Sequence, residues 1–228
     1  MRNSHRYMLT AALSAALVVA LSGVAGALTN PVVDFGAASY AKEGTRTAGD
    51  HTSTAGDMLT IVGKVVVFND PFADLDPNAA GIEYTYVMTD LISQGTTFTS
   101  YYLTNYSGGV FRIYEDSSPD ADFADMATFQ DGTMILEGAF SGFRITTISS
   151  TGTQNADFQF TGGTLFNRVS QFGVGFIGVN TGNFSVSTMF VPQTQRNQGY
   201  FGMSDTKLDV TQPVATESST WGRIKNLY

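Results

Sequence analysis

The sequence contains no cysteine and only two histidines, His5 and His51. A chain without cysteine forms no disulfide bond and offers no thiol for catalysis or lipid attachment. Structural zinc sites normally use several cysteine or histidine ligands, and nucleophilic triads need a histidine held beside a serine or cysteine. This inventory excludes thiol chemistry and disfavours zinc and triad chemistry, so we expect the protein not to be an enzyme.

Basic residues are also scarce, with 12 lysines and arginines against 20 aspartates and glutamates. Nucleic-acid binding depends on a stripe or patch of basic side chains that displaces counterions from the phosphates. The sequence has no such stripe, so we expect no nucleic-acid partner. The acidic excess favours solubility and attracts cations.

The only long apolar stretch lies near the N-terminus, from Met8 to about Leu21. Arg2 and Arg6 precede it and the small residues 25–27 follow it, which is the pattern of a secretory signal peptide. The stretch is shorter than the roughly 20 residues that a membrane-spanning helix needs. We therefore expect a cleaved signal at residues 1–27, no membrane span after cleavage, and a secreted or cell-envelope protein, extracellular or periplasmic.

The rest of the chain divides into three parts by composition. Residues 28–57 form a polar lead-in, in which 32–35 could be a short strand and 37–57 is expected to be a loose segment or long loop. Residues 58–211 are rich in β-branched and aromatic residues and are expected to form one β-domain. Residues 212–228 form a polar tail.

The β-domain shows the two-residue alternation of half-buried strands. Ile82, Tyr84, Tyr86 and Met88 share one face of a predicted strand, for example. About ten short antiparallel strands in one domain predict a single β-sandwich of jelly-roll type. The strand predictions are 58–69, 82–90, 96–104, 110–115, 133–138, 142–149, 156–161, 165–170, 173–179, 184–190, 200–203 and 206–211.

Two acidic loops are the strongest chemical signal. In the first, Asp74, Asp76 and Asn78 occupy alternate positions, which lets three oxygen ligands converge on Ca²⁺. The pattern is not an EF-hand, because Ala79 replaces the turn glycine and Thr85 replaces the closing acid. The second loop gathers several carboxylates that would repel one another unless a cation or solvent relieved them. Its candidate ligands are Asp116, Asp120, Asp122 and Asp125.

Ordinary turn chemistry is the alternative explanation for both acidic loops, since Asp, Asn, Ser and Pro favour turns for backbone reasons. A cluster of tyrosines suggests a second kind of site, because ring faces stack on sugars. Its candidate ligand-binding residues are Tyr101, Tyr102, Tyr106 and Tyr114, and tyrosine is also a routine sheet residue.

These observations favour a secreted, non-catalytic β-sandwich protein with a structural, adhesive or polysaccharide- or matrix-binding role, with Ca²⁺ as a structural ion. An exposed strand edge could also support self-association. One alternative is a carboxylate-dependent glycan-active enzyme, which needs Glu83 and Glu137, or one of them and a loop aspartate, to converge. The other is an outer-membrane β-barrel, which the short predicted strands and the arginines within them disfavour.

Overall fold

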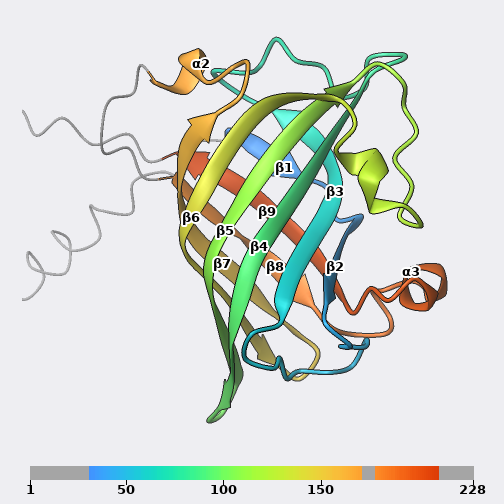
Figure 1. Ribbon diagram of the computed structural model, residues 1–228, viewed down its shortest axis with the longest axis vertical. Helices are drawn as coiled ribbons and strands as arrows, with labels where there is room; N and C mark the ends of the chain where they lie inside the picture. The colour runs from blue at the N-terminus through green and yellow to red at the C-terminus, as the bar shows by residue number, and fades with distance from the viewer. Residues whose placement is uncertain (1–30, 171–177, 211–228) are drawn as a thin grey trace, which may run out of the picture. The chain divides into compact units, whose positions relative to one another are not determined.

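The computed structural model describes residues 31–170 and 178–210. The predicted signal peptide and the tail at 212–228 lie outside these residues, as does most of the strand predicted at 173–179. The described chain is all-β apart from three short helical segments (Figure 1). Within it, no helix is both long and apolar enough to cross a bilayer.

The elements follow one another as a run of long strands joined mostly by turns and loops. In chain order they are β1 (Val33–Phe35), β2 (Ser39–Glu43), β3 (Met58–Phe68), β4 (Glu83–Phe98), β5 (Tyr102–Asp116), the 3-10 helix η2 (Met126–Phe129), β6 (Thr133–Ile148), β7 (Thr151–Gly162), α2 (Asn167–Ser170), β8 (Gly178–Ser185), α3 (Gln193–Asn197) and β9 (Gly202–Val210).

The nine strands of the described residues form one antiparallel sheet that closes on itself. From β3 to β9 each strand pairs with the next along the chain, and both β1 and β2 pair with β3 on one side and with β9 on the other. The two short strands thus share one position, and the sheet is an eight-strand barrel (Figure 1).

The barrel confirms the all-β, antiparallel prediction and corrects the jelly-roll sandwich. A jelly roll needs long connections that carry the chain between two sheets, whereas here neighbours in sequence are neighbours in the sheet. Closure also leaves the described sheet without a free edge, so the strand edge expected to support self-association is not found there.

The strands are longer than predicted because bulges interrupt them without ending them. β4 has 16 residues and β5 has 15, and each covers parts of two predicted strands. Gly95, Gly108 and Gly109 have positive φ angles of 84°, 69° and 94°, and the β4–β5 register shifts between Ser93 and Thr96. Bulges of this kind bend a strand, as barrel closure requires.

Other predicted boundaries fail for local reasons. The strand predicted at 96–104 contains the β4–β5 turn, and the strand predicted at 165–170 contains α2. β8 ends at Ser185, so most of the strand predicted at 184–190 belongs to the loop that follows. The strands predicted at 133–138 and 142–149 merge into β6, and those predicted at 200–203 and 206–211 merge into β9.

The barrel interior is packed with aromatic and aliphatic side chains. The Phe111 ring lies 5.7 Å from the Phe140 ring and 5.0 Å from the Phe158 ring, centroid to centroid. Tyr86 stacks on Phe35 at 3.9 Å. All five side chains are buried, so the interior is a side-chain core.

A second apolar cluster covers part of the outer wall. Val87 and Tyr114 belong to it with Phe129 of η2, which lies in the loop 117–132. The hydroxyl of Thr85 donates a hydrogen bond to the Phe129 carbonyl at 2.9 Å. The outward face of β4, which the alternation predicts to be solvated, is therefore buried along the first half of the strand, at Glu83, Thr85 and Val87.

The lead-in is part of the barrel. Its residues 39–43 form β2, so the prediction of a loose segment or loop is wrong there, while β1 confirms the short strand. Residues 44–57, here called the closing segment, then cross one end of the barrel. The Gly49 amide donates to the Val186 carbonyl at 2.7 Å, and the Ser93 amide donates to the Asp57 carbonyl at 2.8 Å.

Candidate functional site

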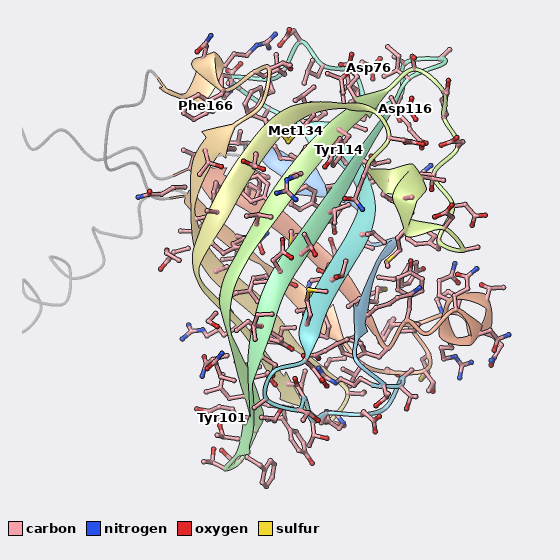
Figure 2. All side chains as sticks on the ribbon, viewed as in Figure 1. Asp76, Tyr101, Tyr114, Asp116, Met134 and Phe166 are labelled. Carbon is pink, nitrogen blue, oxygen red and sulfur yellow. The ribbon has the colours of Figure 1, made fainter. Side chains whose placement is uncertain are left out.

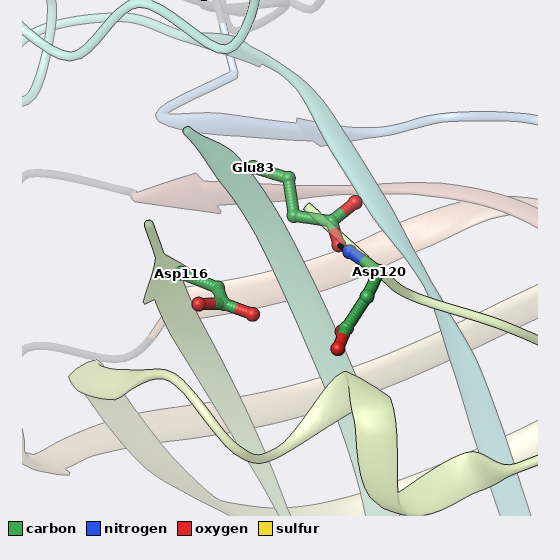
Figure 3. Close-up of side chains that lie close together, drawn as sticks. All are labelled: Glu83, Asp116 and Asp120. Atoms are coloured by element: carbon green, nitrogen blue, oxygen red, sulfur yellow. Dashed lines mark hydrogen bonds between the residues drawn. The ribbon is translucent and has the colours of Figure 1, made fainter. Parts of the chain in front are cut away.

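Three carboxylates converge at the barrel end that carries the loops 69–82 and 117–132, here called the acidic end. Glu83 opens β4, and its register partner Asp116 closes β5. The following loop brings Asp120 back beside them (Figure 3). One carboxylate oxygen from each residue lies within 4.8 Å of the other two. Glu83 is buried, Asp116 is half-buried and Asp120 is exposed.

Glu83 is held as an ionised acceptor. Its Oε1 accepts hydrogen bonds from the backbone amides of Asp120 and Ala121, both at 2.7 Å. Its Oε2 lies 2.5 Å from Lys64 Nζ. Burial alone would raise the pKa of Glu83, but the hydrogen bonds from Lys64 and the two amides, with the Lys64 charge, outweigh it and lower the pKa. This residue therefore suits charge binding better than proton donation.

Asp120 has the opposite shift. Loss of hydration, followed by the negative charges of Asp131, Asp116 and Glu83, raises the pKa of Asp120. Lys64 neutralises one of the three clustered carboxylates, so the cluster keeps an excess of negative charge. Such an oxygen-only set suits a hard cation such as Ca²⁺.

Most of the predicted metal ligands lie elsewhere and have turn or ion-pair partners. Asp74 pairs with Arg168 of α2. Asp76 accepts the Asn78 amide at 2.9 Å within its own turn. Asp122 and Asp125 accept the amides of Ala124 and Ala127, at 2.9 and 3.0 Å. Of the seven residues predicted, the cluster contains only Asp116 and Asp120.

Glu83 is not among the predicted metal ligands, because its alternation with Ile82 and Tyr84 predicts a solvated strand face. One signal could have found it. Glu83 opens the strand that follows the first acidic loop, and a hairpin pairing of β4 with β5 places it opposite the start of the second loop.

Glu83 and Glu137 do not form an acid pair. Glu137 accepts from Arg112 Nε at 2.7 Å and from Thr161 Oγ1 at 3.1 Å. β5 separates the two glutamates, whose partners on it are Asp116 and Arg112. Standard strand spacings then put their backbones about 16 Å apart, and each carboxylate is engaged by separate partners on its own side of β5.

The four candidate tyrosines do not share a surface. Tyr106 points into the barrel, where its hydroxyl donates to Glu43 Oε2 at 3.2 Å, and Tyr114 is buried under the loop 117–132. Tyr101 is 38% exposed, and Tyr102 stacks on His51 at 4.5 Å. Figure 2 shows Tyr101 at the tip of the β4–β5 hairpin and Tyr114 toward the other end of the strands. A continuous platform is thus excluded.

A buried polar network secures the closing segment. Arg46 Nη1 donates to Glu43 Oε2 at 2.5 Å, and Ser53 Oγ donates to Glu43 Oε1 at 2.5 Å. Ser93 Oγ lies 2.5 Å from Ser53 Oγ, and the Arg46 guanidinium sits 4.1 Å from the centre of the Phe201 ring. Glu43, Arg46, Ser53 and Ser93 are all buried, so this network anchors the segment and offers no accessible site.

Two grooves lie on the outer wall, and neither includes the acidic cluster. The first, here called the Phe190 groove, has a volume of 620 Å³ and runs across the wall from β6 to β9. Its lining includes Thr146, Ile148, Thr153, Asn183, Phe190 and Asp205. The second, the Arg144 groove, has a volume of 460 Å³ and is lined by Asn105, Arg144, Asn155 and Asp157, among others.

Comparison with known proteins identifies no relative of this chain. No family model matches the sequence, and no curated protein or solved structure shows detectable similarity to it. Inference about function therefore rests on the chemistry of these sites.

Proposed function

We propose that this protein is a secreted, non-catalytic barrel that binds extracellular polysaccharide or matrix through its outer wall. The Phe190 groove carries this proposal. In the described residues the interior is packed with aromatic and aliphatic side chains, which disfavours the small-molecule carrier function of hollow barrels. A ligand would then bind to the outer wall of the barrel.

The Phe190 groove combines the two features that sugars need. Its floor carries hydroxyl, amide and carboxylate groups from Thr146, Thr153, Asn183 and Asp205, which can exchange hydrogen bonds with sugar hydroxyls. Phe190 is 47% exposed and supplies an apolar ring at the side of the groove. A concave site with few polar groups and one aromatic face is typical of small-ligand recognition.

Two alternatives receive less support. For the predicted enzyme, Glu83 does lie beside the loop aspartates Asp116 and Asp120, but it is buried and paired with Lys64. Glu137 is paired with Arg112, and neither groove contains a glutamate. For the outer-membrane protein, the barrel walls have the wrong polarity: apolar side chains fill the interior and the Arg112–Glu137 pair lies outside it. A bilayer-spanning barrel presents its apolar side chains to lipid.

A glycan array followed by titration calorimetry tests the proposal. Phe190→Ala and Asn183→Ala should each weaken binding of an array hit at least about tenfold, or about 1.4 kcal/mol. Asn105→Ala in the Arg144 groove is the matched control and should leave the affinity unchanged. A blank array, or affinity that is indifferent to Phe190→Ala, would contradict the proposal.

We also propose that Ca²⁺ binds at Glu83, Asp116 and Asp120 and stabilises the loop 117–132. Saturating Ca²⁺ should raise the melting temperature by several degrees, since about 1 kcal/mol shifts it by about 2–4 °C in a chain of this size. Asp120→Asn should abolish the response, whereas Asp76→Asn in the other acidic loop should retain it. A melting temperature that Ca²⁺ and chelator leave unchanged removes the ion from the proposal.

A further inference from the structure

Exposed apolar side chains are concentrated at one end of the barrel. Of the nine large hydrophobic residues that are exposed in the described part of the chain, only Val66 and Val67 lie toward the acidic end. The other seven are Met58, Ile92, Phe98, Tyr101, Ile148, Met189 and Phe190. Five of them lie where the β4–β5 and β6–β7 hairpins turn and just after β8 ends, here called the hairpin end, whereas Met58 opens β3 and pairs with Ile92 within β4.

Five of these residues form a rim over three neighbouring tips. Phe98 and Tyr101 flank the β4–β5 turn, which protrudes in Figure 1. Tyr102 pairs with Thr147, which places this turn next to Ile148 at the end of β6. The β6–β7 hairpin is in turn adjacent to the end of β8, after which come Met189 and Phe190.

The rim carries no charge. Residues 91–111, 145–156 and 178–195 contain no aspartate, glutamate, lysine, arginine or histidine. The loops 69–82 and 117–132 at the acidic end contain seven aspartates and no basic residue. The three hairpin-end tips are therefore uncharged, although the closing segment at the same end carries the exposed Asp50, and the opposite end is strongly anionic.

We propose that the hairpin end docks on a lipid bilayer, with the rim side chains inserted into the interface of a neutral membrane. Phe and Tyr suit the headgroup boundary, where one side is apolar and the other wet. The absence of charge on the tips removes the main cost of insertion. Asp50, an exposed acid in the closing segment, and the overall acidic charge favour neutral over anionic lipid.

The shape of the rim favours lipid over a protein partner. Met189 is 89% exposed and Phe98 is 62% exposed, so each protrudes from its own tip. Separate side chains can each insert into a fluid lipid interface, whereas a protein partner would need a complementary pocket for each of them. Phe190 belongs to both the rim and the Phe190 groove, so the test of docking leaves Phe190 unchanged and alters only rim residues outside the groove.

Vesicle flotation tests this docking. The protein from residue 28 onward contains every described strand and lacks the apolar signal, so it is mixed with phosphatidylcholine vesicles. It should float with them, and raising the salt from about 0.1 to about 1 M should not release it, because no charge pair holds it. The triple variant Phe98→Ser, Tyr101→Ser, Met189→Ser should partition at least tenfold more weakly.

The matched control is Val66→Ser with Val67→Ser, which removes exposed apolar side chains from the opposite end and should leave flotation unchanged. Thermal melts establish that both variants fold. Docking is wrong if the parent protein fails to float, if it floats only with anionic phosphatidylglycerol, or if both variants lose flotation equally. A dimer in light scattering that the triple variant abolishes, without flotation, would instead make this end an interface between two copies.

Discussion

Glu43 and Arg46 form the most buried of the ion pairs in the described residues, with side chains 0% and 4% exposed. Their carboxylate and guanidinium are also tied to Ser53 and to the Phe201 ring. By contrast, the side chains of the Arg112–Glu137 pair are 30% and 25% exposed. Desolvation makes a single unpaired charge far more costly in the first setting than in the second.

Glu43→Gln should lower the free energy of unfolding by about 3–5 kcal/mol, because it leaves the buried Arg46 charge without its counter-ion. Glu137→Gln is the matched control and should cost about 0–1 kcal/mol, as for exposed pairs. Urea denaturation of both variants measures the difference. Equal losses would show that the buried pair is not what holds the closing segment.

His51 links stability to pH. Burial, followed by the positive charge of Arg46, lowers the pKa of His51, although Asp50 acts in the opposite direction. Folding therefore favours the neutral ring, which stacks on Tyr102 and lies 3.2 Å from Thr147 Oγ1. Its contribution to stability is complete above the unfolded histidine pKa of about 6.5 and is lost as the pH falls through the folded pKa.

We expect the urea midpoint of the parent protein to fall between about pH 7.5 and pH 5.5. In His51→Gln this part of the decrease should be absent, since glutamine does not titrate and can still bond to Thr147. Parallel urea curves at both pH values make the comparison. An identical decrease in both proteins would assign the pH dependence to other groups.

At the scale of elements, glycine bulges decide how far each strand runs. The predicted breaks at 91–95 and 105–109 contain Gly95, Gly108 and Gly109, and glycine, asparagine and serine are typical of turns. The structure uses the same residues to bend β4 and β5 while pairing continues on both sides. A local sequence pattern does not distinguish a turn that ends a strand from a bulge within it, because the difference is whether hydrogen bonding to the partner strand resumes.

Gly109→Ala should destabilise the barrel by about 2–4 kcal/mol through strain and overpacking. Its φ is +94°, and an added Cβ would meet Leu91 Cδ2 at 2.3 Å. Gly142→Ala is the control, since its Cβ would meet nothing within 4 Å, and the change should stay within about 0.5 kcal/mol. Thermal unfolding of the two variants distinguishes them, and similar stabilities would rule out Gly109 as a required bulge position.

At the scale of the whole molecule, closure separates the surface into two unlike ends. Side chains along each strand alternate between the interior and the outer wall. Clusters of acidic or of exposed aromatic side chains therefore occur mainly in the loops and turns at the two ends. One end receives the acidic loops and the other the uncharged, aromatic tips. The sites proposed for Ca²⁺ and for lipid are therefore at opposite ends, and the Phe190 groove lies on the wall near the second.

The sequence alone determined the absence of thiol chemistry, the acidic surplus and the antiparallel β class, because residue inventory and two-residue alternation are properties of the chain itself. It could place Asp116 and Asp120 in an acidic loop, yet their approach to Glu83 depends on strand pairing and on the path of the loop. Closure into a barrel, the role of the lead-in and the burial of Tyr106 and Tyr114 were likewise decided by tertiary structure. These features depend on which strands meet and what covers them, and such long-range contacts leave no local pattern in the chain.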